Sequence, residues 1–110
     1  MKKIGFSKLP ESISVNVKKG ESGCLLAELP EYDVFTEADD LNHLYFQVND
    51  LIYTYFDVPK KYQDKISFIP PLSARHELIK IAEQKPEGNE SKFKVSTSYT
   101  PEFYRNVVNF

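Results

Sequence analysis

A run of apolar residues at helical spacing constrains the fold more than any other feature of this chain. Between residues 41 and 55, apolar side chains recur every three or four residues, at Leu41, Leu44, Tyr45, Val48, Leu51, Ile52 and Tyr55. Such spacing places them in one stripe along an α-helix. Asp40 is suited to cap the start of this helix, and Pro59 ends it because the residue before a proline is pushed out of the helical region. The pattern therefore predicts an amphipathic helix whose stripe packs against a core.

Two aromatic residues of the same helix fall outside the stripe. Phe46 and Tyr53 are seven residues apart, so they lie within roughly 20° of each other around the helix. Aromatic side chains rimmed by polar groups are common anchors of protein interfaces. The sequence leaves two interpretations open: a later element of the same domain covers this pair, or the pair contacts a partner or a second copy of the chain.

Alternating segments before the helix predict β-strands. Residues 13–18 alternate apolar and polar side chains, whereas residues 24–29 are more continuously apolar and are followed by Pro30. The polar, glycine-containing residues 19–23 between them predict a hairpin, which makes these two strands antiparallel neighbours. Residues 33–37 predict a third short strand before the long helix.

The second half of the chain predicts a mixture of strands and helices. Further strands are expected at residues 65–70 and 92–99. A second helix is expected within residues 70–84, with Ser73 as its N-cap and with Leu78, Ile79 and Ala82 as its apolar stripe. A short terminal helix is expected from Thr100, because Pro101 suits a first helical position. The predicted architecture is an α+β single domain, residues 1–110, with a small antiparallel sheet, one main packed helix and a C-terminal helix–strand extension.

The net charge of −2 conceals an asymmetry between the two halves. Residues 1–59 hold five lysines and ten acidic residues, whereas residues 60–110 hold nine basic and six acidic residues. Residues 20–59, called the acidic window below, contain no lysine or arginine. An acidic surface argues against nucleic acid as the partner of this half and favours a basic protein. The alternative is that the asymmetry has no functional role, because many soluble domains are acidic on one side.

From its composition we expect a cytoplasmic protein. No apolar run approaches the length of a membrane span, and no apolar segment follows the basic residues of "MKKIGFSKLPESI" as a secretory signal would require. Cys24 is the only cysteine, which excludes an internal disulfide and fits a reducing compartment. Its position in the apolar run "CLLAEL" favours a packed side chain over a reactive thiol.

The sequence predicts no catalytic, cofactor or metal site. A nuclease of the RNase H type needs carboxylates on its central strands to hold Mg²⁺, but residues 13–18 contain none and Glu28 stands alone at a strand end. Capping of the long helix accounts for the acids at Glu37, Asp39 and Asp40. His43 and His76 lie on different predicted helices without an adjacent nucleophile. We therefore expect a protein that is not an enzyme, and a small hydrolase is the weakest hypothesis.

A series of short motifs runs from the first hairpin to the end of the long helix. They are Gly23 in the turn, Glu28-Leu29-Pro30 at the end of the second strand, Phe35-Thr36 in the third strand, and the cap-and-leucine pair Asp40-Leu41, followed without a gap by the helix through Tyr55. The series resembles the core of the HicB-type antitoxins over residues 13–69. The chain reads "LPEYDVFT" where that family usually carries a Pro-Gly pair. Residues 70–110 show no helix-turn-helix or ribbon-helix-helix unit, so direct DNA binding is not expected.

The resemblance implies a fold and a function. The fold would be a partial RNase H-like β-β-β-α-β unit that forms a homodimer or a larger homo-oligomer. Its role in a toxin–antitoxin system would be to neutralise a small basic ribonuclease toxin of the HicA kind by covering the RNA-binding surface of that toxin. The expected partner-binding residues are Phe46 and Tyr53, together with the nearby acids Asp50, Glu37 and Asp39. The alternative is an orphan HicB-like domain that self-associates through the aromatic pair and the strand at 92–99.

Overall fold

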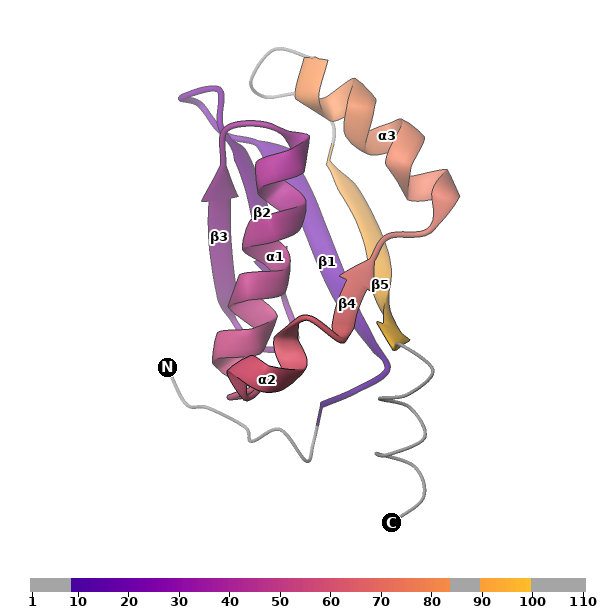
Figure 1. The fold of residues 1–110 in the computed structure, drawn as a ribbon. Coiled ribbons are helices and arrows are strands. Elements are labelled where there is room, and N and C mark those ends of the chain that lie inside the picture. The colour runs from indigo at the N-terminus through magenta and orange to yellow at the C-terminus, as the bar shows by residue number, and fades with distance from the viewer. Residues whose placement is uncertain (1–8, 84–89, 100–110) are drawn as a thin grey trace.

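A five-stranded antiparallel sheet with helices packed on one face forms the described part of the molecule (Figure 1). The computed structural model describes residues 9–83 and 90–99. Within these ranges the elements are β1 (Ser12–Lys19), β2 (Leu25–Leu29), β3 (Val34–Ala38), α1 (Leu41–Tyr55), α2 (Lys60–Gln63), β4 (Ile66–Ile69), α3 (Leu72–Glu83) and β5 (Ser91–Tyr99). The predicted α+β class and the antiparallel sheet are confirmed.

The first two strands form the predicted hairpin. The Gly20 N–H donates a hydrogen bond of 2.8 Å to the Cys24 carbonyl oxygen, which closes the hairpin before β2 begins. Gly23 has a φ of 90°, a left-handed conformation that residues with a side chain rarely adopt. A glycine at this position therefore allows the tight turn.

The order of strands across the sheet is β3-β2-β1-β5-β4. The last strand of the sequence, β5, lies between β1 and β4 and is antiparallel to both, with Val95 opposite Ile13 and Thr97 opposite Phe68. The predicted strand at 92–99 is therefore an interior strand of the sheet. Within the described residues, β4 has no strand neighbour other than β5.

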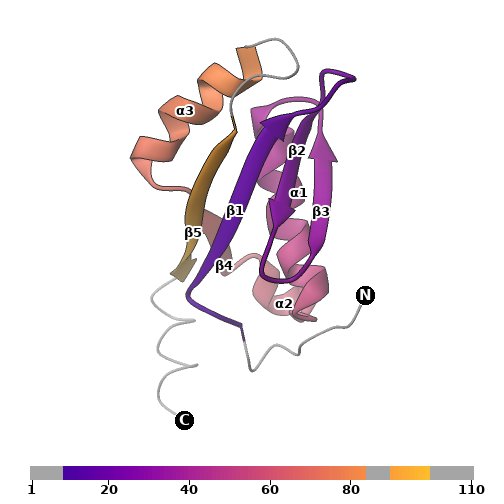
Figure 2. The same ribbon diagram turned by 180° about the vertical axis from the view of Figure 1, so that it is seen from behind.

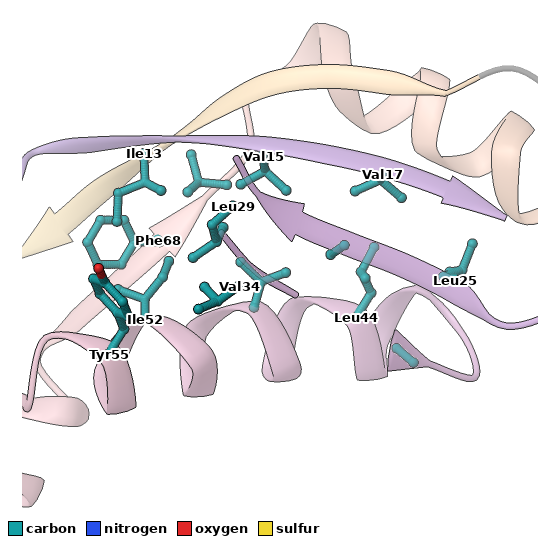
Figure 3. Close-up of a cluster of buried hydrophobic side chains, with 14 of the residues drawn as sticks. Ile13, Val15, Val17, Leu25, Leu29, Val34, Leu44, Ile52, Tyr55 and Phe68 are labelled. Carbon is teal, nitrogen blue, oxygen red and sulfur yellow. The ribbon is translucent and has the colours of Figure 1, made fainter. Parts of the chain in front are cut away.

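The long helix α1 covers one face of the sheet, as expected from its stripe. Asp40 caps it, because its carboxylate accepts a hydrogen bond of 2.8 Å from the His43 N–H. Figure 3 shows side chains of β1, β2, β3 and β4 pointing toward the buried side of α1. Side chains of the stripe are buried or half-buried, which confirms the prediction. The opposite face of the sheet, toward the viewer in Figure 2, carries none of the three helices of the described residues.

The second helix differs from the prediction in two respects. It begins at Leu72, because the Pro71 carbonyl oxygen accepts hydrogen bonds from the two amides three and four residues later. Ser73 therefore lies inside the first turn, and its expected role as N-cap is wrong. The buried face of α3 consists of Ala74, Leu78 and Ile81. Ile79 is 45% exposed, so its expected place in the apolar stripe is also wrong.

Two further elements complete the comparison with the sequence. The four-residue helix α2 has no apolar period and was not predicted. The terminal helix expected from Thr100 lies outside the described residues. None of the helices in residues 9–83 and 90–99 is long and apolar enough to cross a membrane.

Candidate functional site

A surface hollow of about 600 Å³ lies between α1, β4 and the start of α3. We call it the α1–β4 hollow. Its lining side chains come from three segments of the chain: Tyr45, Phe46, Asn49, Asp50 and Tyr53 from α1, Gln63, Asp64, Ser67, Phe68, Ile69 and Pro70 from the α2–β4 region, and Arg75 from α3. Three of the five predicted partner-binding residues, Phe46, Asp50 and Tyr53, therefore meet at one place.

The two aromatic residues outside the helical stripe have different surroundings. Phe46 is 66% exposed, and its ring forms part of the open surface of the hollow. Tyr53 is half-buried against the core. Its hydroxyl donates a hydrogen bond to the Ile66 carbonyl oxygen and lies 3.1 Å from the Gln63 carbonyl oxygen. A later element thus covers much of Tyr53, whereas Phe46 remains available for contact.

Burial changes the acidity of Tyr53. It raises the pKa of the Tyr53 phenol above its ordinary value of 10.0, and the negative charges of Asp64 and Asp50 raise it further. A hydrogen bond with Ser67 acts in the opposite direction. The phenol therefore stays protonated and can donate to the edge of β4 throughout the physiological pH range.

Asn49 fastens the edge strand β4 to α1. Its side-chain oxygen accepts a hydrogen bond of 2.7 Å from the Phe68 N–H, and its side-chain nitrogen donates one of 3.0 Å to the Phe68 carbonyl oxygen. The same nitrogen lies 2.9 Å from the Tyr45 carbonyl oxygen. The amide of Asn49 thus satisfies the two backbone groups of Phe68 that a further strand would otherwise pair with.

Sequence reasoning did not identify this role of Asn49. The available signal was its position in the middle of a helix, where asparagine is unfavourable because its side chain competes for backbone hydrogen bonds. An asparagine retained there indicates that its amide bonds a backbone outside the local turn. The sequence could not indicate that this backbone belongs to β4.

The charges around the hollow are mixed. Asp50 and Asp64 are exposed acids on its rim, and Arg75 from α3 is half-buried in its lining. An exposed aromatic ring beside two carboxylates suits a partner that presents an apolar side chain together with lysine or arginine. The arrangement is one of contact groups around a concave surface.

The other two predicted partner-binding residues lie outside this hollow. Glu37 is exposed on β3, and its backbone oxygen accepts a long hydrogen bond of 3.4 Å from the Gln47 side chain. Asp39 lies in the turn between β3 and α1, where its N–H donates to Nδ1 of His43 at 3.2 Å and its carboxylate lies 3.8 Å from Sγ of Cys24. The five residues therefore do not form one continuous site.

All acidic side chains of the acidic window face solvent. The acidic window holds nine of them, and each is exposed: Glu21, Glu28, Glu31, Asp33, Glu37, Asp39, Asp40, Asp50 and Asp57. They belong to β2, β3, α1 and the turns before, between and after these elements. Exposed acids are thus distributed along this part of the chain, without an exposed lysine or arginine among them.

Metal coordination has no evident site in the part of the chain that the structure describes. No three histidine, cysteine, aspartate or glutamate side chains of these residues come close enough together to hold an ion. Comparisons of the chain with protein-family models, with characterised proteins and with solved structures found no match.

Proposed function

We propose that this chain is a non-enzymatic binding protein of the HicB antitoxin type, which neutralises a small basic HicA-like ribonuclease by covering its RNA-binding surface. The observation that carries the proposal is the exposure of all nine acids in a window without lysine or arginine. An anionic surface attracts a basic partner and competes with the phosphates of its RNA. The same charge disfavours direct binding of nucleic acid by this half of the chain.

The α1–β4 hollow supports the proposal with a specific contact. Phe46 supplies an exposed aromatic anchor, and Asp50 lies on the same rim. Interfaces obtain most of their affinity from a few such anchors, surrounded by polar groups that exclude water. Phe46 and Asp50 are therefore the residues whose substitution should weaken the complex most.

The arrangement of the first elements is compatible with a partial RNase H-like unit. Three antiparallel strands are followed by a capped helix and a further strand, from β1 to β4. The short loop "PEYD" closes without the Pro-Gly pair of the family, because Asp33 adopts a φ of 55° and Tyr32 donates its N–H to the Leu29 carbonyl oxygen at 3.0 Å. Aspartate tolerates this left-handed conformation better than most residues. In this proposal, β5 completes the sheet of the unit.

Co-expression with a small basic protein encoded by a neighbouring gene tests the proposal. We expect that protein to arrest growth when it is produced alone, and we expect this chain to relieve the arrest and to co-purify with it. The double variant Phe46→Ala/Asp50→Lys should lose both effects. Glu83→Lys is the matched control, because Glu83 is an exposed acid of α3 that lies outside both the acidic window and the lining of the hollow. Growth arrest that this chain does not relieve would contradict the proposal.

A second candidate function is self-association of an orphan domain, and the exposure of Phe46 favours it. Both edges of β5 are paired within the sheet, so this strand can contribute only its open face to such a contact. Sedimentation velocity over a range of concentrations distinguishes the two functions. An oligomer that Phe46→Ala dissociates would support self-association through the hollow, whereas an unchanged association state would exclude Phe46 from the contact.

A further inference from the structure

The two edge strands of the sheet, β4 and β3, differ in how their outward backbone groups are hydrogen-bonded. At the β4 edge, the side chain of Asn49 forms hydrogen bonds with the outward N–H and carbonyl oxygen of Phe68. The outward carbonyl oxygen of Ile66 accepts a hydrogen bond from the Tyr53 hydroxyl. Side chains of α1 thereby close this edge to an additional strand. Proteins commonly block edge strands in some such way, because free backbone groups recruit other chains.

The outward groups of the other edge strand, β3, follow from the ladder. Hydrogen-bonded pairs alternate along antiparallel strands, and the bond from Gly20 to Cys24 fixes the phase between β1 and β2. Leu25, Ala27 and Leu29 therefore direct their backbone groups toward β3. Their partners there are the first, third and fifth residues of β3. The backbone N–H and carbonyl oxygen of Phe35 and Glu37 consequently point away from the sheet.

Within residues 9–83 and 90–99, these outward groups of β3 have almost no hydrogen-bond partners. Among the described residues, their one side-chain partner is Gln47, which donates its long bond to the Glu37 carbonyl oxygen. The sequence of β3 is VFTEA, without the lysine or proline that protects many edges. Phe35 is 61% exposed on the open face of the sheet, with Glu28 directly opposite it on β2. The edge therefore offers unpaired backbone, one apolar side chain and neighbouring carboxylates.

We infer that the β3 edge binds an extended basic segment of a partner protein, which adds to the sheet as a sixth, antiparallel strand. Backbone hydrogen bonds to Phe35 and Glu37 would hold the segment in place, and alternate side chains would select it. On the open face, a lysine or arginine would lie beside Glu37 and an apolar residue beside Phe35. This inference rests on the proposed function, since it names the contact by which a basic partner is held.

Charge argues against a second copy of the chain as the occupant. In an antiparallel β3–β3 pairing, the outward residues Phe35 and Glu37 of one copy must face Phe35 or Glu37 of the other. If the two Phe35 residues pair, the turn that carries Asp33 of one copy lies beside Glu37 of the other. If Phe35 pairs with Glu37, this turn lies beside Asp39 of the other copy. If the two Glu37 residues pair, they face each other. Each of these registers brings carboxylates together and is destabilised by their repulsion, whereas a basic strand avoids it.

A synthetic peptide tests the inference without a known partner. The probe is acetyl-Thr-Lys-Thr-Val-Thr-Lys-amide, in which the lysines and the valine share one face of a strand. We expect it to shift the amide NMR signals of Phe35 and Glu37 and to slow their hydrogen exchange. Replacing both lysines by glutamate should weaken binding about tenfold or more, because the acidic neighbours then repel the peptide.

N-methylated peptides provide the matched control. Methylating the backbone nitrogens of the lysines and the valine removes the N–H groups that would face β3, whereas methylating those of the threonines removes N–H groups that would face solvent. Each lost hydrogen bond is worth about 1 kcal/mol, so we expect the first peptide to bind about tenfold more weakly or worse and the second to bind almost unchanged. The inference would be overturned if the two methylated peptides lost the same affinity, or if only NMR signals around Phe46 moved. It would also be overturned if the unmethylated peptide did not bind at millimolar concentration.

Variants of the protein separate this inference from the proposed function. Glu37→Pro removes an outward N–H that the ladder to β2 does not use, and proline is tolerated on strand edges in that orientation. Glu37→Gln removes only the charge. We expect Glu37→Pro to lose more peptide affinity than Glu37→Gln at unchanged folding.

Relief of toxin arrest by Glu37→Pro at wild-type level would overturn the β3 contact and leave the antitoxin proposal standing. Peptide binding at β3 without any relief of growth arrest would support the β3 contact and contradict the antitoxin proposal. A dimer of the unliganded protein that Glu37→Pro dissociates would replace the basic strand by a second copy.

Discussion

Replacing Asn49 by alanine tests how α1 holds the edge of the sheet. In the variant, the Phe68 N–H and carbonyl oxygen lose their partners at 2.7 and 3.0 Å. Phe68 as a whole residue, backbone included, is only 2% exposed, so water reaches these backbone groups poorly. Leaving a buried donor or acceptor without a partner costs about 1–3 kcal/mol.

The expected loss of stability follows from these two groups. If each group costs about 1–2 kcal/mol, the lower half of that range, the two together cost about 2–4 kcal/mol. Alanine offsets about 0.6 kcal/mol of this loss, because its helix propensity is higher than that of asparagine. The free energy of unfolding should therefore fall by about 2–3 kcal/mol, which corresponds to a decrease in Tm of about 10–20 °C for a chain of this size. Chemical denaturation followed by circular dichroism measures the first quantity and a thermal melt the second.

Asn42→Ala is the control for this experiment. Asn42 is exposed on the same helix, and within the described residues its side chain makes no hydrogen bond, so its replacement should leave stability unchanged or raise it by about 0.6 kcal/mol. Amide hydrogen exchange at Phe68 should accelerate in Asn49→Ala and stay unchanged in Asn42→Ala. If the two variants had the same free energy of unfolding within about 0.5 kcal/mol, the fastening of β4 by Asn49 would be refuted.

Three further substitutions probe the same framework. Tyr53→Phe should cost about 1 kcal/mol by removing the hydroxyl bonded to the β4 backbone. Because burial raises the pKa of Tyr53 above 10.0 in the folded state, its contribution is fully present below pH 10 and is lost as the pH rises further, since the unfolded chain releases the proton first. The decline in stability above pH 10 should therefore be shallower in Tyr53→Phe, which alkaline denaturation measures; an equal decline would exclude Tyr53 as its source. Asp40→Ala should cost about 1 kcal/mol in chemical denaturation by removing the N-cap of α1, and a stability equal to that of the wild type would contradict the capping. Ser91→Ala breaks the 2.6 Å hydrogen bond from Oγ to the Glu77 carboxylate, which joins β5 to α3, and should cost about 1 kcal/mol and speed amide exchange in α3; unchanged exchange there would show that this bond does not hold the helix.

Local patterns predicted the elements whose side chains alternate or recur regularly. The stripe from Leu41 to Tyr55 and its cap follow from helical spacing and a single aspartate, and the structure agrees with both. The helix α2 has only four residues, too few for a period. Ser73 as N-cap predicts a later start for α3 than the structure shows, because the carbonyl oxygen of Pro71 already accepts the first helical hydrogen bonds.

Long-range pairing lay beyond the local pattern. Nothing in the alternation of β5 indicates that it lies between β1 and β4 instead of at the end of the sheet, because strand order depends on which edges the connecting segments can reach. For the candidate site, the helical wheel placed Phe46 near Tyr53, and both line the hollow. The bond from Tyr53 to β4 could not be foreseen, because the position of β4 depends on that strand order.

Inhibition of RNA cleavage tests the proposed function most directly. The small basic protein encoded by a neighbouring gene would be purified, and its cleavage of RNA would be measured with increasing amounts of this chain. We expect cleavage to fall to background at a fixed stoichiometry. Phe46→Ala/Asp50→Lys should require a large excess to achieve the same inhibition, while Glu83→Lys should behave as the wild type. Cleavage that continues undiminished in an excess of this chain would contradict the proposed function.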